Sequence, residues 1–187
     1  DPAALKAALS AADVVYFSGI TLAILAPIAR GNFLQAVAAA KANGCRVAFD
    51  PNHRPQLWDS LTAMTEATLQ AAGIADWALP SFDDEQRFFG DADLQACAQR
   101  YLAAGAREVA VKNAGNTMVV ADTDHQEMSD VGTPNVPVDS TAAGDAFNAA
   151  YLAARLASQS AADAARAGHA LASRVISAHG ALVALDV

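Results

Sequence analysis

Clusters of basic residues are absent from this sequence, although binding to a nucleic-acid backbone depends on them. The 12 lysines and arginines form no run, and 20 aspartates and glutamates outnumber them, which gives a formal net charge of -8. Long hydrophobic runs are absent too, and no apolar stretch reaches the roughly 18 residues from which a membrane-spanning helix is inferred. We therefore expect neither a nucleic-acid partner nor a membrane span.

Cysteine is scarce, and the familiar nucleotide-binding loops are missing. Cys45 and Cys97 show neither metal-ligand spacing nor a disulfide framework, so we expect both to be small core residues. The first residues lack the basic and apolar regions of a signal peptide, which favours a cytoplasmic location. The sequence contains no Gly-x-x-x-x-Gly-Lys-Ser/Thr, and no Gly-x-Gly-x-x-Gly after a strand. Any ATP site must therefore be built differently.

Apolar residues are plentiful, and they are distributed over alternating short and long segments. With 187 residues, 53% of them hydrophobic, the chain can form one domain with a real core, residues 1–187. Residues 122–137 are polar and read as a loop or an edge strand. Strands are expected at 14–17, 46–49, 76–79, 108–111 and 117–121, and helices after 21 and at 32–42, 61–72, 83–88, 91–104, 143–156 and 161–179.

This alternation predicts an α/β fold with a mostly parallel sheet and helices on both faces, because parallel strands need crossover connections. Ligands bind such sheets beyond the carboxyl ends of the strands. Polar residues follow three of the expected strands, at Asp50 to Arg54, at Ser81 to Glu85 and at Lys112 with Asn113. We expect a ligand site there.

Small residues lead into the helix expected at 143–156. The first backbone N–H groups of a helix lack partners and lie at the positive end of its dipole, so Ala142, Ala143 and Gly144 offer an anion site. Asp145 in the same turn can accept the proton of a substrate hydroxyl. Alternatively, Ser140 or Thr141 caps an ordinary helix and Asp145 complements its dipole. Spacing alone leaves both interpretations open.

Residues 139–147 read Asp-Ser-Thr-Ala-Ala-Gly-Asp-Ala-Phe. This segment resembles the C-terminal signature of the ribokinase-like (PfkB) carbohydrate kinases, which usually reads Asp-Thr-Thr-Gly/Ala-Ala-Gly-Asp-x-Phe. The resemblance implies a three-layer α/β/α fold, ATP and Mg²⁺ as cofactors, and Asp145 as catalytic base. It also implies that the backbone amides of Ala142, Ala143, Gly144 and Asp145 form the anion hole.

Residues 50–58 read Asp-Pro-Asn-His-Arg-Pro-Gln-Leu-Trp. Within the family they resemble a segment of the 2-keto-3-deoxygluconate kinases, which implies a sugar-acid substrate. Arg54 offers a planar fork that suits a carboxylate, and Asn52 can contact the nucleotide or orient the loop. Alternatively, Arg54 pins a proline-rich loop that Asp50 caps. His53 is interpreted as solvent-facing.

The three consecutive acids that begin the helix at 83–88 usually serve as partners of the helix dipole and nothing more. In the family, however, an Asn-x-x-Glu element acts through water on Mg²⁺ and the phosphates. Aligning Ser81 with the Asn puts Asp84 at the Glu position, so the resemblance implies that Asp84 serves the metal indirectly, through water.

Residues 111–117 correspond to the nucleotide loop of the family, often Val-Lys-x-Gly-x-x-Gly. Lys112 is present, but Ala114 and Thr117 replace the two glycines and Gly115 lies between them. By resemblance these four residues bind the nucleotide, whereas by pattern alone they form a plain β-turn. Gly180 and Ala181 match a pair that lies near the adenine in relatives. His125, His169 and His179 show no metal spacing and are expected to be structural or exposed.

The resemblance aligns this chain with roughly the C-terminal three-fifths of a family member. The N-terminal strands, a Gly-Gly sugar motif and the small β-lid are expected to lie outside it. The implied activity is ATP-dependent phosphorylation of 2-keto-3-deoxygluconate at its terminal hydroxyl, with the sugar acid and ATP as partners and room for a homo-oligomer in the complete enzyme. The alternatives are a kinase for another sugar or sugar acid and a non-catalytic nucleotide-binding fragment.

Overall fold

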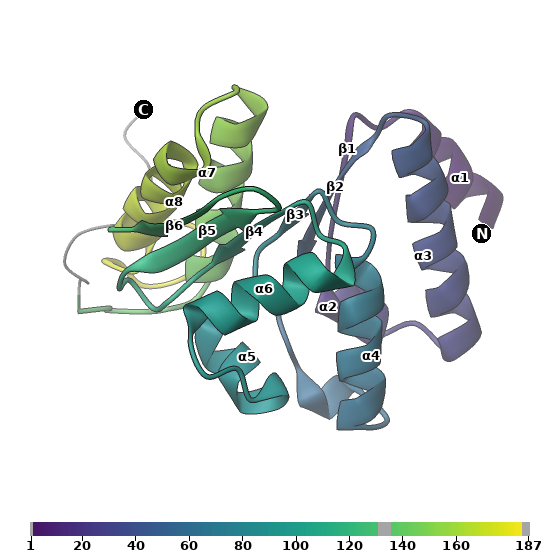
Figure 1. The fold of residues 1–187 in the computed structure, drawn as a ribbon, viewed down its shortest axis with the longest axis horizontal. Coiled ribbons are helices and arrows are strands. Elements are labelled where there is room, and N and C mark those ends of the chain that lie inside the picture. The colour runs from purple at the N-terminus through teal and green to yellow at the C-terminus, as the bar shows by residue number, and fades with distance from the viewer. Residues whose placement is uncertain (1, 131–135, 185–187) are drawn as a thin grey trace.

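A six-stranded sheet with its strands in chain order organises the fold (Figure 1). The computed structural model describes residues 2–130 and 136–184. The first four strands are parallel, and the last two continue the sheet antiparallel. The mostly parallel sheet is thus confirmed, and the polar segment after residue 122 contributes the edge strand. The strands are β1 (Val14–Ser18), β2 (Arg46–Asp50), β3 (Trp77–Ala78), β4 (Glu108–Val111), β5 (Met118–Asp122) and β6 (Gln126–Ser129).

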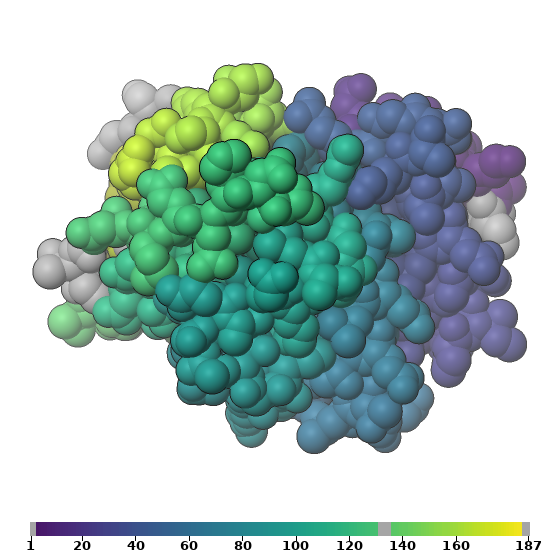
Figure 2. Space-filling model, viewed as in Figure 1, coloured from purple at the N-terminus to yellow at the C-terminus, as the bar shows by residue number. Residues whose placement is uncertain are grey.

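Helices cover both faces of this sheet and make three layers (Figure 1). Figure 2 shows the face of the molecule that α6 occupies, with the beginning and the end of the chain at opposite sides. Within the described ranges, no helix is both long and apolar enough to cross a membrane. The helices are α1 (Pro2–Ser10), α2 (Gly19–Ala23), α3 (Pro27–Ala42), α4 (Leu61–Ala72), α5 (Phe82–Phe89), α6 (Leu94–Ala104), α7 (Ala143–Leu156) and α8 (Ala161–Val175), with a short 3-10 turn, η1 (Pro55–Leu57).

Side chains of alternate residues in a strand pack into hydrophobic clusters on opposite faces of the sheet. In β4, Val109 and Val111 pack in the cluster that contains α6, whereas Ala110 packs with α7 and α8 on the opposite face. In β2, Val47 and Phe49 join a third cluster with α3 and α4. Because side chains alternate across a strand, one short apolar run serves both faces. Cys45 and Cys97 are buried and free, as the sequence predicted.

Several helix ends differ from the sequence prediction, and each has a local cause. Helix α3 begins at Pro27, five residues earlier than expected, because proline suits the first turn. Helix α6 begins after Asp93, whose carboxylate accepts the Ala96 N–H at 2.8 Å. Helix α8 stops at Val175, before the predicted end at His179, and the Ile176 carbonyl accepts the Val138 N–H at 2.8 Å instead.

The turn after β1 lies against the loop after β2. A Cβ atom on Gly19 would stand 1.9 Å from the Pro51 carbonyl oxygen, so a residue with a side chain cannot occupy that position without moving the loop. Ser18 is the N-cap of α2, and the Thr21 hydroxyl accepts the Ser18 N–H at 3.5 Å. Ser18 at the end of β1 pairs with Asp50 at the end of β2, so the carboxyl ends of the two strands lie side by side.

Helices α7 and α8 pack closely at Gly168, which yields a stability prediction. A Cβ atom at Gly168 would lie 2.7 Å from the Phe147 ring and 3.0 Å from its carbonyl oxygen. We expect Gly168→Ala to lower the free energy of unfolding by about 1–3 kcal/mol in urea denaturation, because the helices must separate. Gly31→Ala in α3 is the matched control: nothing lies within 4 Å of its Cβ position, and it should stabilise by about 0.5–1 kcal/mol. Equal effects of both substitutions would refute close packing.

Candidate functional site

The first turn of α7 presents backbone donors at the carboxyl edge of the sheet. Ala142, the N-cap, has left-handed backbone with φ 63°, which turns the chain sharply into the helix. The Ala143 N–H donates to the Ser140 carbonyl at 3.2 Å. Among the described residues, the N–H groups of Ala142, Gly144 and Asp145 have no acceptor. Three of the four predicted amides are thus without a partner at the positive end of a helix dipole, beside the exposed carboxylate of Asp145.

Asp139 fixes the loop that precedes this turn. Its carboxylate accepts the Thr141 N–H at 2.8 Å and the Gly180 N–H at 2.9 Å. These hydrogen bonds to Thr141 and Gly180 lower the pKa of Asp139 to about 2. Asp139 therefore holds the α7 entry against the segment that follows α8.

A polar cavity of about 210 Å³ lies in front of the α7 N-terminus. It brings together nine of the predicted site residues, which come from four separate stretches of the chain. Such convergence of carboxylates, amides and cations in one concave site is typical of ligand sites. The predicted residues that line it are Asn52, Arg54, Ser81, Asp84, Lys112, Ala142, Ala143, Gly144 and Asp145, with Asp50 and Ser140 beside them.

Beneath this cavity, the buried Asn148 amide joins α7 to two strands. Its Nδ2 donates to Asp50 Oδ2 at 2.8 Å and to the Tyr16 hydroxyl at 3.2 Å, and its Oδ1 accepts from Lys112 Nζ at 3.1 Å. Lys112 Nζ is also 3.5 Å from Asp50 Oδ1. Burial and the Asp50 carboxylate raise the pKa of Tyr16, so its phenol keeps its proton. Lys112 supplies the positive charge of this network, and it lies beneath the first turn of α7.

Lys112 reaches close to the anion-binding turn. Its Nζ lies 3.8 Å from the position that a Cβ of Gly144 would take. Side-chain exposure of Lys112 is 10%, so its charge acts in a medium that screens it less than bulk water does. Lys112 and the small-residue turn therefore offer donors to the same cavity.

A second cavity, of about 300 Å³, adjoins the polar one and is mainly apolar. Ala114 and Gly115 of the predicted nucleotide loop lie on one side, and α8 supplies His169 and Ser173 on the other. Burial lowers the pKa of His169, which favours the neutral imidazole, and its Nε2 is 3.3 Å from the Ser173 hydroxyl. The remaining lining residues are Ser81, Asp83, Lys112, Asn113, Met118, Pro137, Ser140, Ala143, Gly144, Phe147, Ala172 and Ile176.

Three predicted nucleotide-site residues line neither cavity. The Thr117 carbonyl accepts the Asn113 side-chain amide at 3.0 Å, so Thr117 closes the β4–β5 turn. Gly180 contributes its N–H to Asp139, and Ala181 is exposed. Their predicted roles stay predictions.

The interpretation of His53 as solvent-facing is wrong. His53 is 3% exposed, and its Nε2 lies 3.0 Å from the fully buried Glu85 carboxylate. Glu85 is therefore not a surface partner of the helix dipole, as the run of acids suggested. A run of three acids gives no sign of which one turns inward. The helical period does: residue 85 falls on the inner face of α5 with Phe82 and Phe89.

Sequence reasoning also missed Tyr16, Asn148 and His169. Asn148 offered a signal, because it is a polar residue three positions after Asp145 and therefore on the same side of the helix. Tyr16 lies within a run that reads as an ordinary buried strand. His169 lies on an alanine-rich helix, and only the packing of α8 beside the β4–β5 turn gives it a cavity to line.

The polar cavity suits a metal bound through water better than one bound by a cage of side chains. Burial raises the pKa of Asp84, which faces the cavity from α5. Within the described residues, the group of metal-ligating atoms close enough to share an ion is Glu85, Asp91 and Cys97, away from this cavity. Asp84 fits the indirect role that the sequence predicted, because Mg²⁺ commonly keeps several waters.

Comparison with protein families gives a match over residues 1–186 to the "pfkB family carbohydrate kinase". Among curated proteins, the "2-dehydro-3-deoxygluconokinase" of Escherichia coli is 38% identical over 185 residues, which are 97% of this chain and 60% of that protein. The protein of the same name from Dickeya dadantii is 38% identical over 178 residues, 93% of this chain and 57% of that protein. The chain thus spans about 60% of the length of these relatives.

Solved structures agree on the fold. A PfkB protein from Polaromonas superposes with a TM-score of 0.80 and 26% identity, over 92% of this chain and 56% of that one. A putative ribokinase II from E. coli, in complex with ATP and Mg²⁺, superposes with a TM-score of 0.77 and 22% identity, over 94% and 56%. The three-layer ribokinase-like fold expected from the sequence is confirmed.

The hydrogen bonds of Asp139 predict a pH-dependent anchor. Because its pKa is depressed from 3.8 to about 2, the stabilisation is complete above pH 3.8 and is lost as the pH falls through 2. We expect Asp139→Asn to raise the amide hydrogen-exchange rate of Gly180 at pH 6, since the new amide nitrogen cannot accept an N–H. The exposed Asp59→Asn is the matched control and should leave Gly180 unchanged. Unaltered exchange in Asp139→Asn would contradict the anchor.

Proposed function

The chain belongs to the pfkB family of carbohydrate kinases, and from this premise we propose that it carries the catalytic base and the ATP site of a sugar-acid kinase. The proposed reaction is transfer of the γ-phosphoryl group of ATP to the terminal hydroxyl of 2-keto-3-deoxygluconate. The observation that carries the proposal is the polar cavity, where Asp145, the first-turn amides of α7 and Arg54 face one space.

Asp145 is proposed as the general base. Its carboxylate is exposed at the cavity and lies in the first turn of α7, so it can accept the proton of a hydroxyl group that enters there. The N–H groups of Gly144 and Asp145 donate to charge that develops on the transferred group. The Ala142 and Ala143 amides complete the predicted anion hole. Of these, the Ala143 N–H must first leave the Ser140 carbonyl.

Lys112 and Asp84 are proposed to act on the phosphates from the two sides of the cavity. Lys112 Nζ approaches the α7 turn from below, and its charge complements an anion held by the amides. From the α5 side, Asp84 would hold Mg²⁺ through water, and the ion would supply positive charge that offsets the charge developing during transfer.

The apolar cavity is the proposed binding site of the nucleotide base. It adjoins the polar cavity through five shared residues, so a base in one and phosphates in the other form one continuous ligand. Ala114 and Gly115 border the base from the β4–β5 turn, and α8 closes the other side. A mostly apolar lining with a few polar groups is typical of such sites.

The substrate class rests on Arg54 and on the relatives. A guanidinium fork pairs with a carboxylate in two parallel hydrogen bonds, an interaction that a neutral sugar cannot offer. The relatives at 38% identity are named 2-dehydro-3-deoxygluconokinase, whereas a fructokinase of Vibrio alginolyticus matches at 28% over 131 residues. A kinase for another sugar acid is the alternative within the family, and a substrate panel separates the two.

A different class of function is a nucleotide-binding fragment without catalytic activity. Calorimetric titration of the 187-residue chain with ATP, followed by a kinase assay on the same sample, distinguishes the two. Binding without turnover supports the fragment, and turnover by the chain alone rejects it.

Replacing the base should abolish turnover without loss of nucleotide binding. We expect Asp145→Asn to lower kcat in the complete protein by about 10³-fold or more, with the dissociation constant for ATP within about twofold, because the amide cannot take the proton. Asp163→Asn is the matched control, since Asp163 occupies the first turn of α8 and pairs with Arg166. Turnover retained by Asp145→Asn would reject the assignment.

Removing the fork should weaken binding of acids and spare neutral sugars. We expect Arg54→Ala to raise the KM for the sugar acid by roughly 10–100-fold, the range for a lost charge-assisted pair. Arg107→Ala, at the amino end of β4 with a side chain 77% exposed, is the control and should leave KM unchanged. An equal rise for a neutral sugar of the same size would refute the carboxylate clamp.

A further inference from the structure

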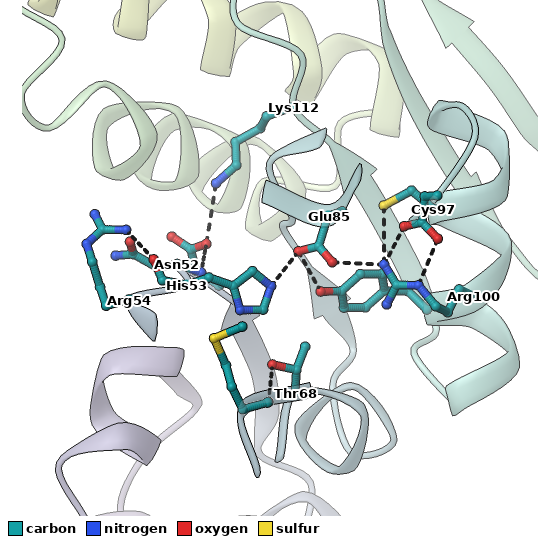
Figure 3. Close-up of polar contacts among 12 residues, drawn as sticks. Asn52, His53, Arg54, Thr68, Glu85, Cys97, Arg100 and Lys112 are labelled. Atoms are coloured by element: carbon teal, nitrogen blue, oxygen red, sulfur yellow. Dashed lines mark hydrogen bonds and ion pairs between the residues drawn. The ribbon is translucent and has the colours of Figure 1, made fainter. Parts of the chain in front are cut away.

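A buried ionic cluster lies directly behind the loop that carries Arg54 (Figure 3). Its centre is the Glu85 carboxylate of α5, which is fully buried. Oε1 of Glu85 lies 3.0 Å from His53 Nε2 and accepts the Tyr101 hydroxyl at 3.0 Å, and Oε2 accepts Arg100 Nη2 at 2.8 Å. Arg100 also donates to Asp91 through Nε, at 3.0 Å. The cluster therefore joins α5 and α6 to a loop more than 30 residues earlier in the chain.

The cluster is not an empty metal site. Glu85, Asp91 and Cys97 offer ligand atoms within 4.8 Å of one another. Arg100, however, donates to both carboxylates and so fills the space with a cation from the chain itself (Figure 3). Buried charges of this kind add little net stability over apolar residues of similar volume, and in some proteins their role is to fix geometry instead. A positional role is therefore the reading that the contacts support.

The proton on His53 can be assigned from its partners. Both Glu85 oxygens already accept hydrogen bonds, Oε2 from Arg100 and Oε1 from Tyr101, so the carboxylate acts here as an acceptor. Nε2 of His53 is therefore the donor in its contact with Glu85. The imidazole also packs against Phe88 and Phe89, with ring centroids 5.4 and 5.9 Å away. Its position is fixed by one polar and two aromatic contacts.

The backbone of His53 carries the neighbouring site residues. Its carbonyl accepts Arg54 Nη1 at 2.7 Å, so the guanidinium is bound to the backbone of the anchored residue. On the other side, Asn52 has φ 35°, a left-handed conformation that costs energy for a residue other than glycine. The Asn52 N–H donates to Asp50 Oδ1 at 3.2 Å. This strained turn is held at both ends, by Asp50 and by His53.

We propose that His53, fixed by Glu85, is a positioning residue that aims Arg54 and Asn52 into the polar cavity. The inference rests on the proposed function, in which Arg54 binds the substrate carboxylate. In Figure 3 the His53 ring points toward Glu85 and α6, whereas Arg54 points the opposite way. An anchor of this kind lowers the conformational freedom that the loop must lose when substrate binds.

The test compares three substitutions in the complete protein. His53→Leu removes the donor and leaves Glu85 with one partner fewer, His53→Gln keeps an N–H donor near the Nε2 position, and Tyr101→Phe removes a different hydrogen bond from the same carboxylate oxygen. The readouts are amide hydrogen exchange of Asn52 by NMR, and separate KM values for the sugar acid and for ATP.

We expect His53→Leu to accelerate exchange of the Asn52 amide and to raise the KM for the sugar acid about tenfold, the effect of one lost hydrogen bond of about 1.4 kcal/mol. The KM for ATP should rise less, because Asn52 is one of several predicted nucleotide contacts whereas Arg54 is the proposed carboxylate clamp. His53→Gln should restore most of both properties, and Tyr101→Phe should leave both at wild-type values while lowering the melting temperature. Glu85→Gln, which keeps the shape of the side chain, should shift both readouts in the direction of His53→Leu and carries the test if the leucine variant does not fold.

Two results would overturn the inference. The first is an Asn52 amide exchange rate that stays at the wild-type value in both His53→Leu and Glu85→Gln. The second is a rise in the sugar-acid KM of Tyr101→Phe equal to that of His53→Leu, which would indicate general destabilisation. Failure of the proposed function has a different signature, because the wild-type protein would then neither bind nor phosphorylate a sugar acid. Exchange at Asn52 would still decide the positioning role in that case.

Discussion

The hydrogen bonds of one buried side chain, Asn148, connect the elements that make up the site. Its amide binds Asp50 at the end of β2 and Lys112 at the end of β4, although these residues lie 98 and 36 positions earlier in the chain. Because Asn148 is on α7, the same contacts set the N-terminus of that helix over the carboxyl edge of the sheet. The first-turn amides, Asp145 and the Lys112 charge thereby face one cavity, whose composition follows from this docking.

Strained backbone is concentrated at the same edge. Among the described residues, four that are not glycine have a positive φ. Three of these belong to loops that border the two cavities, namely Asn52, Ala114 and Ala142. Such conformations persist when surrounding contacts over-determine them. Here the contacts are in part known: Asp50 holds Asn52, and Asp139 holds the approach to Ala142. Strain and anchoring together indicate loops that are set before ligand arrives.

Charge is arranged in two layers around the loop after β2. The front layer, with Arg54, Asp84 and Asp145, borders a cavity open to solvent, whereas the rear layer pairs the fully buried Glu85 of α5 with the mostly buried Arg100 of α6. The electrostatic potential at the site is set by nearby amides and a few cations, so an acidic protein can bind an anion there. The net charge of -8 does not set this local potential.

The sequence by itself determined the α/β class, most element positions and the position of the α7 turn, because these depend on local periodicity, caps and a long contiguous motif. Helices at 61–72 and 143–156 have the predicted bounds. The tertiary structure alone decided that His53 is the partner that Glu85 meets, and that Tyr16 and Asn148 share a network. Such pairings depend on which faces pack together, and no local pattern specifies contacts between residues 32 or 132 positions apart.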